Sequence, residues 1–171
     1  NAATFTGGAG ETWTLNNTGA TPAQIVGSPS LLFNSTAGSF MKSSAFTSNQ
    51  PFTDYIVARR ITDVVSGRLF DGNTNDSATM IWSDTNKYYL YAGTNYLPGT
   101  IDSTTGAYAI LGSQMNGATS FMFNGTTESV AGNAGAANAD ALTMGAKSDG
   151  TAPGNWQIKE WIRRVAADGT A

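Results

Sequence analysis

The chain has 171 residues, of which 40% are hydrophobic and only 12% are charged, and its formal net charge is −3. It contains no Cys and no His, which excludes disulfides, thiol nucleophiles, Cys-based zinc sites and a Ser-His-Asp triad. No cluster of Lys and Arg predicts a nucleic-acid interface, and no run of about 18 apolar residues predicts a membrane span. The length predicts one domain, and the abundance of Asn, Thr, Ser, Gly and Ala favours strands and turns over long helices.

Residues 1–29 are rich in Gly, Thr and Asn, and we expect an N-terminal arm or edge strand there. Over residues 30–171, short apolar runs alternate with turn residues, as is typical of strands in a single sandwich domain. The runs that predict strands cover residues 31–33, 39–41, 55–61, 68–70, 80–82, 88–91, 108–111, 120–123, 126–130 and 142–144. Their spacing of about 8–12 residues predicts an all-β fold, a two-sheet antiparallel β-sandwich.

The clearest turn signal is Asn124-Gly125, which lies between two β-prone runs. A type I′ hairpin turn needs positive φ at both of its central residues, and Asn-Gly is a pair that tolerates this conformation. We therefore predict a hairpin whose central residues are Asn124 and Gly125.

Residues 156–165 fit two kinds of structure. Read as a helix, the segment shows an apolar stripe at Ile158, Trp161, Ile162 and Val165. Read as a strand, it places on one face Trp156, Ile158, Glu160 and Ile162. Periodicity slightly favours the helix, but we predict a strand because of the resemblance described next.

Four segments carry a resemblance to a known family in their order and spacing. They are SLLFN at 30–34, FTDYIVARR at 52–60, GRLFDG at 67–72, and the run 121–162 with its FMFNG, LTMG and NWQIKEWI motifs. This pattern resembles the concanavalin A-like lectin/glucanase superfamily, in its LamG-type jelly-roll branch. The resemblance implies a jelly roll whose last strand returns beside the opening strand. The chain departs from the family pattern at Trp156, where the family usually has Gly.

Acidic residues are too sparse for the chemistry of the glucanases in this superfamily. Those enzymes carry acidic residues at alternate positions of one strand, which brings an acid and a nucleophile to one face. The chain has three Glu residues, Glu11, Glu128 and Glu160, and none has an acidic residue two positions away. Glu160 matches the family's Glu on the closing strand, where we favour a structural role. We predict no catalytic residue and no enzymatic activity.

The run from Asp71 to Asp76 begins like a calcium-binding loop, with carboxylate or amide oxygens at its first, third and fifth positions. It then departs from the motif, because Asp76 replaces the glycine of position six and Trp82 replaces the glutamate of position twelve. Many domains of the resembled superfamily bind calcium near such loops, but here Asp71 and Asn73 fit turn caps better. We predict no cofactor and no metal ligand, since the calcium motif is incomplete.

Aromatic residues crowd the middle of the chain. Exposed aromatic rings beside Asn and Asp are how lectin-like sites hold sugars, whereas buried rings fill the core. We expect the core to take Trp82 and one face of the Tyr-rich strand, and Tyr96 to be the most exposed ring. The candidate ligand-binding residues are therefore Trp82, Tyr89, Tyr91, Tyr96, Asp71 and Asn73.

These observations favour a non-enzymatic structural or interaction module. The first hypothesis is a surface domain of a virion (a phage capsid decoration, fibre or tail domain) that also binds glycans. The alternative is a carbohydrate-binding module of a secreted multidomain enzyme or adhesin. We expect a virion or extracellular location, other virion or surface subunits and glycans as partners, and a homo-oligomeric or lattice-bound state. Contacts are expected from the N-terminal arm and from loops 71–77, 93–106 and 131–141.

Overall fold

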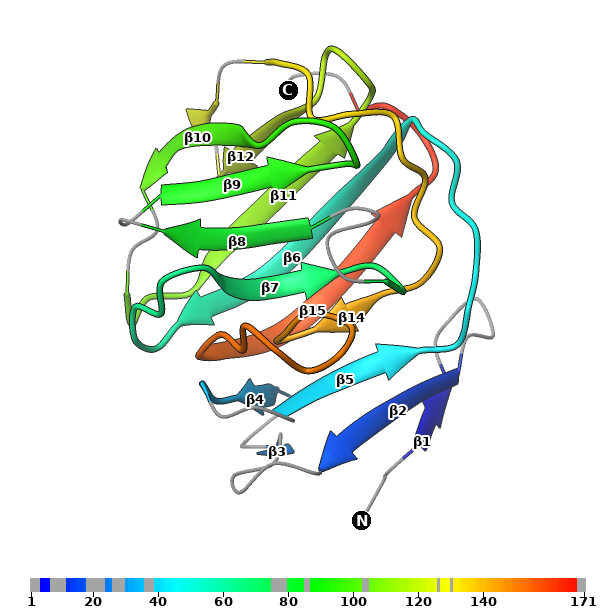
Figure 1. The fold of residues 1–171 in the computed structure, drawn as a ribbon. Helices are drawn as coiled ribbons and strands as arrows, with labels where there is room; N and C mark the ends of the chain where they lie inside the picture. Colours follow the sequence, from blue (N-terminus) through cyan, green and yellow to red (C-terminus); the bar gives the residue numbers. More distant parts are fainter. Residues whose placement is uncertain are drawn as a thin grey trace.

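The protein is all-β in a computed structural model that describes residues 4–6, 12–17, 24–25, 30–35, 39–74, 80–84, 87–102, 105–125, 127–129 and 131–168. These residues form two layers of antiparallel strands, seen one behind the other in Figure 1. No helix that could cross a membrane occurs in the described part of the chain. The predicted two-sheet antiparallel sandwich is confirmed.

Each layer is one sheet whose neighbouring strands are antiparallel. The eight-stranded sheet has the order β1 (Thr4–Thr6), β2 (Thr12–Asn17), β5 (Ser39–Ser43), β14 (Thr143–Met144), β7 (Gly67–Asp71), β8 (Met80–Asp84), β9 (Lys87–Tyr91), β10 (Leu97–Asp102). The seven-stranded sheet has the order β13 (Thr127–Glu128), β12 (Phe121–Asn124), β11 (Ala109–Met115), β6 (Phe52–Arg60), β15 (Trp156–Arg164), β4 (Leu31–Phe33), β3 (Gln24–Ile25). The closing strand β15 pairs with the opening strand β4, as the family resemblance implies.

The segment 1–29 contributes strands to both sheets. β2 lies between β1 and β5, and it pairs with β5 from Trp13 to Asn17. β3 adds to the other sheet through pairs with β4. The first part of the chain is therefore paired into the sandwich through β1, β2 and β3.

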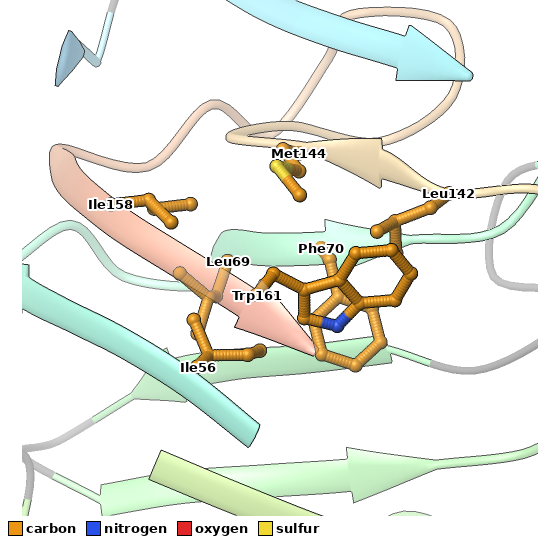
Figure 2. Close-up of a pocket in the computed structure, with 7 residues that line it drawn as sticks. All are labelled: Ile56, Leu69, Phe70, Leu142, Met144, Ile158 and Trp161. Carbon is orange, nitrogen blue, oxygen red and sulfur yellow. The ribbon is translucent and has the colours of Figure 1, made fainter. Parts of the chain in front are cut away.

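The core lies between the two sheets. Its largest fully buried apolar side chains are Trp156, Phe33, Phe52, Phe70, Ile56, Leu69, Leu90, Met115 and Leu142. Trp156, which stands where the resembled family usually has Gly, stacks on Tyr88 of the facing sheet with 6.2 Å between ring centroids. Figure 2 shows apolar side chains from both layers meeting around Trp161, and they leave no room for a water molecule. This region is packed interior.

A β-bulge in β15 changes which of its residues face the core. Ile158 pairs with Ala58, but Glu160 already pairs with Val57, the next residue along β6. Two residues of β15 therefore oppose one residue of β6, and the alternation of faces shifts by one position. Before the bulge the core-facing residues have even numbers, and after it Trp161 faces the core (Figure 2).

The bulge explains why the sequence of this segment suggested a helix. It brings Ile158 and Trp161 to the same face three positions apart, which is a helical spacing. The prediction of a strand is confirmed. The prediction that one face holds Trp156, Ile158, Glu160 and Ile162 is wrong, because Glu160 and Ile162 lie after the bulge and are exposed on the outer face.

The predicted hairpin forms between β12 and β13, but its turn lies one residue later than predicted. Asn124 pairs with Thr127, so Asn124 belongs to the strand and the turn begins at Gly125. Gly125 has φ of +61° and its N–H donates to the carbonyl oxygen of Ile110. Asn124 is therefore the last residue of β12, because its pairing with Thr127 of β13 extends the strand by one residue.

We expect Gly125→Val to lower the free energy of unfolding by roughly 1–2 kcal/mol, since a β-branched residue resists positive φ. A Cβ at this position would meet no atom within 4 Å, so the loss reports backbone strain alone. Thermal unfolding measures the effect, and Gly125→Asn is the matched control because Asn tolerates positive φ. Equal melting temperatures for the wild type and the Val variant would contradict this turn geometry.

Candidate functional site

The tyrosines of β9 divide between the core and the outer surface of the eight-stranded sheet. Tyr88 and Leu90 are buried, whereas Tyr89 and Tyr91 are half-buried on the opposite face. This is the alternation expected of a strand with one face on the core. The prediction that one face of this strand fills the core is confirmed, and the face is that of Tyr88.

Tyr91, which is half-buried, and the exposed Tyr96 form an aromatic pair across the connection from β9 to β10. Their ring centroids are 4.9 Å apart and their planes differ by 33°. Tyr96 is 57% exposed, which confirms the prediction that its ring is exposed. Thr94 and Asn95 between them are also exposed. The connection therefore presents two adjoining rings with hydroxyl and amide groups beside them.

The backbone of this connection is held by the segment 131–139. Ala92 is completely buried, and its N–H donates to the carbonyl oxygen of Ala134 over 2.7 Å. The carbonyl oxygen of Ala92 accepts from the N–H of Ala137 over 2.9 Å. Gly135 packs directly against the backbone of Ala92 and Thr94. The backbone between the two tyrosines is therefore held in place by its contacts with the segment 131–139.

Gln50 in turn fixes the supporting segment. Its Nε2 donates to the carbonyl oxygens of Gly135 and Ala137, at 3.2 and 2.7 Å. Its backbone N–H donates to Oδ1 of Asn138, and its Oε1 accepts from the N–H of Gly117. Both polar groups of this side chain therefore have partners. Gln50 connects its own loop with the segment 131–139 and with the turn at Gly117.

The expected contact loop at 131–141 needs a partial correction. Ala134 and Ala139 have no exposed surface, and Ala141 is 1% exposed. Small side chains are needed here because the segment covers one end of the core. The parts that are exposed, among them Asn133 and Asn138, remain accessible to a partner.

Trp82 is placed beside Tyr89 by the strand register, since the two are paired residues of β8 and β9. Its backbone is described and its side chain lies outside the described part of the structure. Tyr91 pairs in the same way with Met80. The structure thus brings the backbones of three of the predicted aromatic residues, Trp82, Tyr89 and Tyr91, onto neighbouring strands.

Asp71 lies at the same end of the sheet as Tyr91, two strands away. Phe70, Ile81 and Leu90 form one row through the register of β7, β8 and β9, and Asp71 and Tyr91 follow them. A spacing of about 4.8 Å per strand puts roughly 10 Å between the two backbones. The structure does not bring them into one contact site.

The side chain of Asp71 is fully buried and caps its own turn. Its Oδ1 accepts from the N–H of Gly72 over 2.8 Å, and Thr143 Oγ1 donates to the Gly72 carbonyl. Asn73 is exposed, with its N–H donating to Asp140 Oδ1 and its carbonyl accepting from Lys42 Nζ. This geometry matches the turn-cap interpretation. No group of three acidic side chains that could hold a metal ion occurs among the described residues.

Sequence reasoning missed a second surface, on the outer face of the seven-stranded sheet. Tyr55 and Phe123 pack edge to face there with 5.4 Å between ring centroids. Tyr108 lies under Lys159 Nζ at 4.1 Å and under the Arg59 guanidinium at 5.1 Å. Alternation along β6, with Tyr55 and Arg59 on one face, was the available signal.

No family model matches the sequence, and no curated protein matches it. Similar solved structures do exist. Domain 4 of AbnA, a GH43 extracellular arabinanase from Geobacillus stearothermophilus in complex with arabinotriose, superposes with a TM-score of 0.65 and 14% identity, over 90% of this chain and 81% of that chain. The native heptameric SAP-like pentraxin from Limulus polyphemus superposes with a TM-score of 0.59 and 10% identity, over 94% and 78%.

Trypanosoma rangeli sialidase contains a similar unit, with a TM-score of 0.68 and 10% identity over 94% of this chain. The chain spans only 28% of that enzyme's length. At these identities the likeness is one of fold. The shared β-sandwich agrees with the resemblance to the concanavalin A-like superfamily.

Proposed function

We propose that this domain is a non-catalytic carbohydrate-binding module and that its ligand stacks on Tyr91 and Tyr96. The observation that carries the proposal is the contact between the exposed ring of Tyr96 and the half-buried ring of Tyr91 at the β9–β10 connection. Aromatic faces bind the apolar faces of sugar rings, and the neighbouring polar groups of Thr94 and Asn95 can accept and donate hydrogen bonds to sugar hydroxyls. Tyr89 extends the same face along β9.

The rigid support beneath the rings strengthens this proposal. A site that is already ordered loses less conformational freedom when a ligand binds, so more of the interaction energy appears as affinity. The backbone contacts of Ala92 with Ala134 and Ala137 supply this order. The arabinanase domain, which has the same fold, was solved with arabinotriose, and this supports a sugar as the ligand class.

The absence of catalysis is part of the proposal. Glu160 is exposed on the outer face of the seven-stranded sheet, where its pair across the ladder is Val57. Asp54, the acidic residue of β6, points between the sheets and pairs with Arg163. In the described part of the chain, the recorded partners of the Asp54 carboxylate are Arg163 and Trp161. A retaining glycosidase would instead use two carboxyl groups about 5 Å apart. We further propose that binding requires no cofactor and no calcium.

A glycan array followed by calorimetry with the best oligosaccharide tests the site. Tyr96→Ala should weaken binding by at least about tenfold, because stacking on an aromatic face is lost. Tyr108→Ala is the matched control, since it removes a tyrosine from the outer face of the other sheet. Binding that survives loss of Tyr96 but disappears with Tyr108 would overturn the assignment. Release of reducing sugar from the bound oligosaccharide would overturn the non-catalytic role.

An interaction module on a virion or another extracellular surface is the second candidate. The observation that favours it is the exposure of two apolar side chains on the outer face of the seven-stranded sheet, where Ile110 and Ile162 are about half exposed. Such a face is typical of a protein that contacts other subunits. The virion context and the LamG-type assignment remain predictions, and electron microscopy of the native assembly would test the first.

A further inference from the structure

A second row of residues lies beside the Tyr91–Tyr96 pair on the outer face of the eight-stranded sheet. In the ladder between β9 and β10, Pro98 pairs with Tyr89. Continued toward the connection, the same register sets Tyr96 opposite Tyr91, in agreement with the contact between their rings. The two pairs are two positions apart along each strand, so they share a face. We call them the first row (Tyr91 and Tyr96) and the second row (Tyr89 and Pro98).

Both rows present surface to solvent at one end of the sheet. Tyr96 and Pro98 are exposed, and the two outward tyrosines of β9 are half-buried. β10 is the last strand in the order of the eight-stranded sheet, as Figure 1 shows. Proline has no N–H to offer to a further strand, so an edge that carries Pro98 resists extension of the sheet by a peptide. The surface suits a ligand that lies on the side chains.

The distance between the rows exceeds the reach of one sugar ring. Strand residues two positions apart on the same face are separated by about 7 Å. Apolar contact requires atoms within about 4–4.5 Å of each other. A sugar ring centred on the first row therefore leaves most of the second row uncovered, and a second ring is needed to cover Tyr89 and Pro98. The two rings would follow one another along β9, as consecutive units of a chain do.

The side chains of both rows are uncharged. Tyrosine and proline carry no charge at neutral pH, and the exposed Thr94 and Asn95 beside the first row offer only hydroxyl and amide groups. At the other end of β9, Lys87 pairs in the ladders with Asp84 of β8 and Asp102 of β10. One cation thus stands in register with two acidic residues, which gives no excess of positive charge for a carboxylated or sulfated glycan. The surface therefore favours a neutral ligand.

We propose that the ligand of this domain is a linear, neutral oligosaccharide that lies along β9 and covers both rows. The inference rests on the proposed carbohydrate-binding function and adds to it the length, the direction and the charge of the ligand. The first row holds one sugar unit, and the second row holds a unit further along the chain. The apolar face of each unit stacks on the side chains, while its hydroxyl groups meet water and the polar groups of Thr94 and Asn95.

Calorimetry with linear neutral oligosaccharides of arabinose, xylose, glucose and galactose, each from the disaccharide to the hexasaccharide, tests the length of the site. In a series that binds, the affinity should rise at least about tenfold from the disaccharide to the hexasaccharide, because the longer chain reaches the second row. Equal affinities for all lengths, or binding on a glycan array confined to branched or acidic glycans, would overturn this inference alone. No binding by any series or on the array would overturn the proposed function itself.

Tyr89→Ala tests the second row. It should weaken hexasaccharide binding at least about fivefold and disaccharide binding by much less, whereas Tyr96→Ala should weaken both, because a short ligand occupies the more exposed first row. Tyr89→Phe is the matched control, since it keeps the ring and should retain most of the hexasaccharide affinity. Circular dichroism should show all three variants folded. Equal losses for the two lengths in the Tyr89→Ala variant, or no loss for either, would overturn the arrangement in two rows.

Oligogalacturonides, the acidic counterparts of the galactose series, test the charge of the ligand. They should bind at least about tenfold more weakly than the neutral hexasaccharide that binds, because their carboxylates find no excess of positive charge on this face. Added NaCl should change the affinity for the neutral ligand by less than about twofold, since no ion pair is formed. Tighter binding of the oligogalacturonides, or an affinity that falls steeply with salt, would overturn the neutral class.

Discussion

Replacing Asp54 with Ala is expected to lower the free energy of unfolding by about 3–5 kcal/mol. The Asp54 side chain has no exposed surface and accepts three hydrogen bonds between the sheets. Arg163 donates to it through Nε over 2.7 Å and through Nη2 over 2.8 Å, and Trp161 Nε1 donates over 3.0 Å. The guanidinium of Arg163 lies over the Phe52 ring at 4.3 Å. Without the carboxylate, a buried cation would remain among aromatic rings.

Urea denaturation at neutral pH measures this loss, and two controls separate its causes. Asp149→Ala removes a carboxylate that caps an exposed turn at Thr151, and it should cost about 1 kcal/mol or less. The double variant Asp54→Leu with Arg163→Met should recover much of the stability, because it removes both charges together. A single Asp54 variant as stable as the Asp149 variant would contradict the buried ion pair.

Gly135→Ala should lower the free energy of unfolding by roughly 2–4 kcal/mol. Gly135 has φ of +111°, and a Cβ there would stand 2.2 Å from the Ala92 carbonyl oxygen and 2.8 Å from the Thr94 nitrogen. These are backbone atoms, so no side chain can rotate away. The β9–β10 connection would have to shift, and Tyr96 with it.

Gly106→Ala is the matched control for this effect. Gly106 has φ of +84°, but a Cβ there would meet nothing within 4 Å, so only the backbone strain of about 1 kcal/mol remains. Chemical denaturation and sugar binding should be measured for both variants. We expect Gly135→Ala to weaken binding as well as stability, and Gly106→Ala to leave binding unchanged. Equal losses of stability in the two variants would contradict the close contact with the β9–β10 connection.

Sequence patterns alone were sufficient for the fold class and for features that depend on neighbouring residues. Strand-forming runs at regular spacing predicted the sandwich, because each run must bury one face against another layer. The hairpin at Gly125 followed from the backbone preference of glycine. The placement of Tyr88 in the core and of Tyr91 on the outer face followed from the two-residue period of a strand. Each of these signals acts over a few residues, so it can be recognised without knowledge of the partners.

The bulge in β15 and the exact position of the hairpin turn were decided by pairing. The alternation of β15 shifts after Ile158 because β6 offers one residue against two, and the spacing of Ile158 and Trp161 by itself indicated a helix instead. Asn124 extends a strand that the sequence ended one residue earlier, because Thr127 pairs with it. Register is a property of two strands together, and a single strand does not contain it.

Only the tertiary structure decided which polar residues are interior and which surfaces are available for binding. Asp54 is buried because Arg163, 109 positions away, neutralises and hydrogen-bonds it. The sequence of the Ala- and Gly-rich segment 131–139 predicts a loop. In the structure Ala134 and Ala139 of this segment are buried against the core, and Gln50 binds the segment through two of its carbonyl oxygens. The sequence by itself predicted most of the strands and the turn at Gly125, but it placed a loop at 93–106, where β10 (Leu97–Asp102) forms. Burial of a charge or of a small-residue segment depends on distant partners, so only the assembled sandwich determined it.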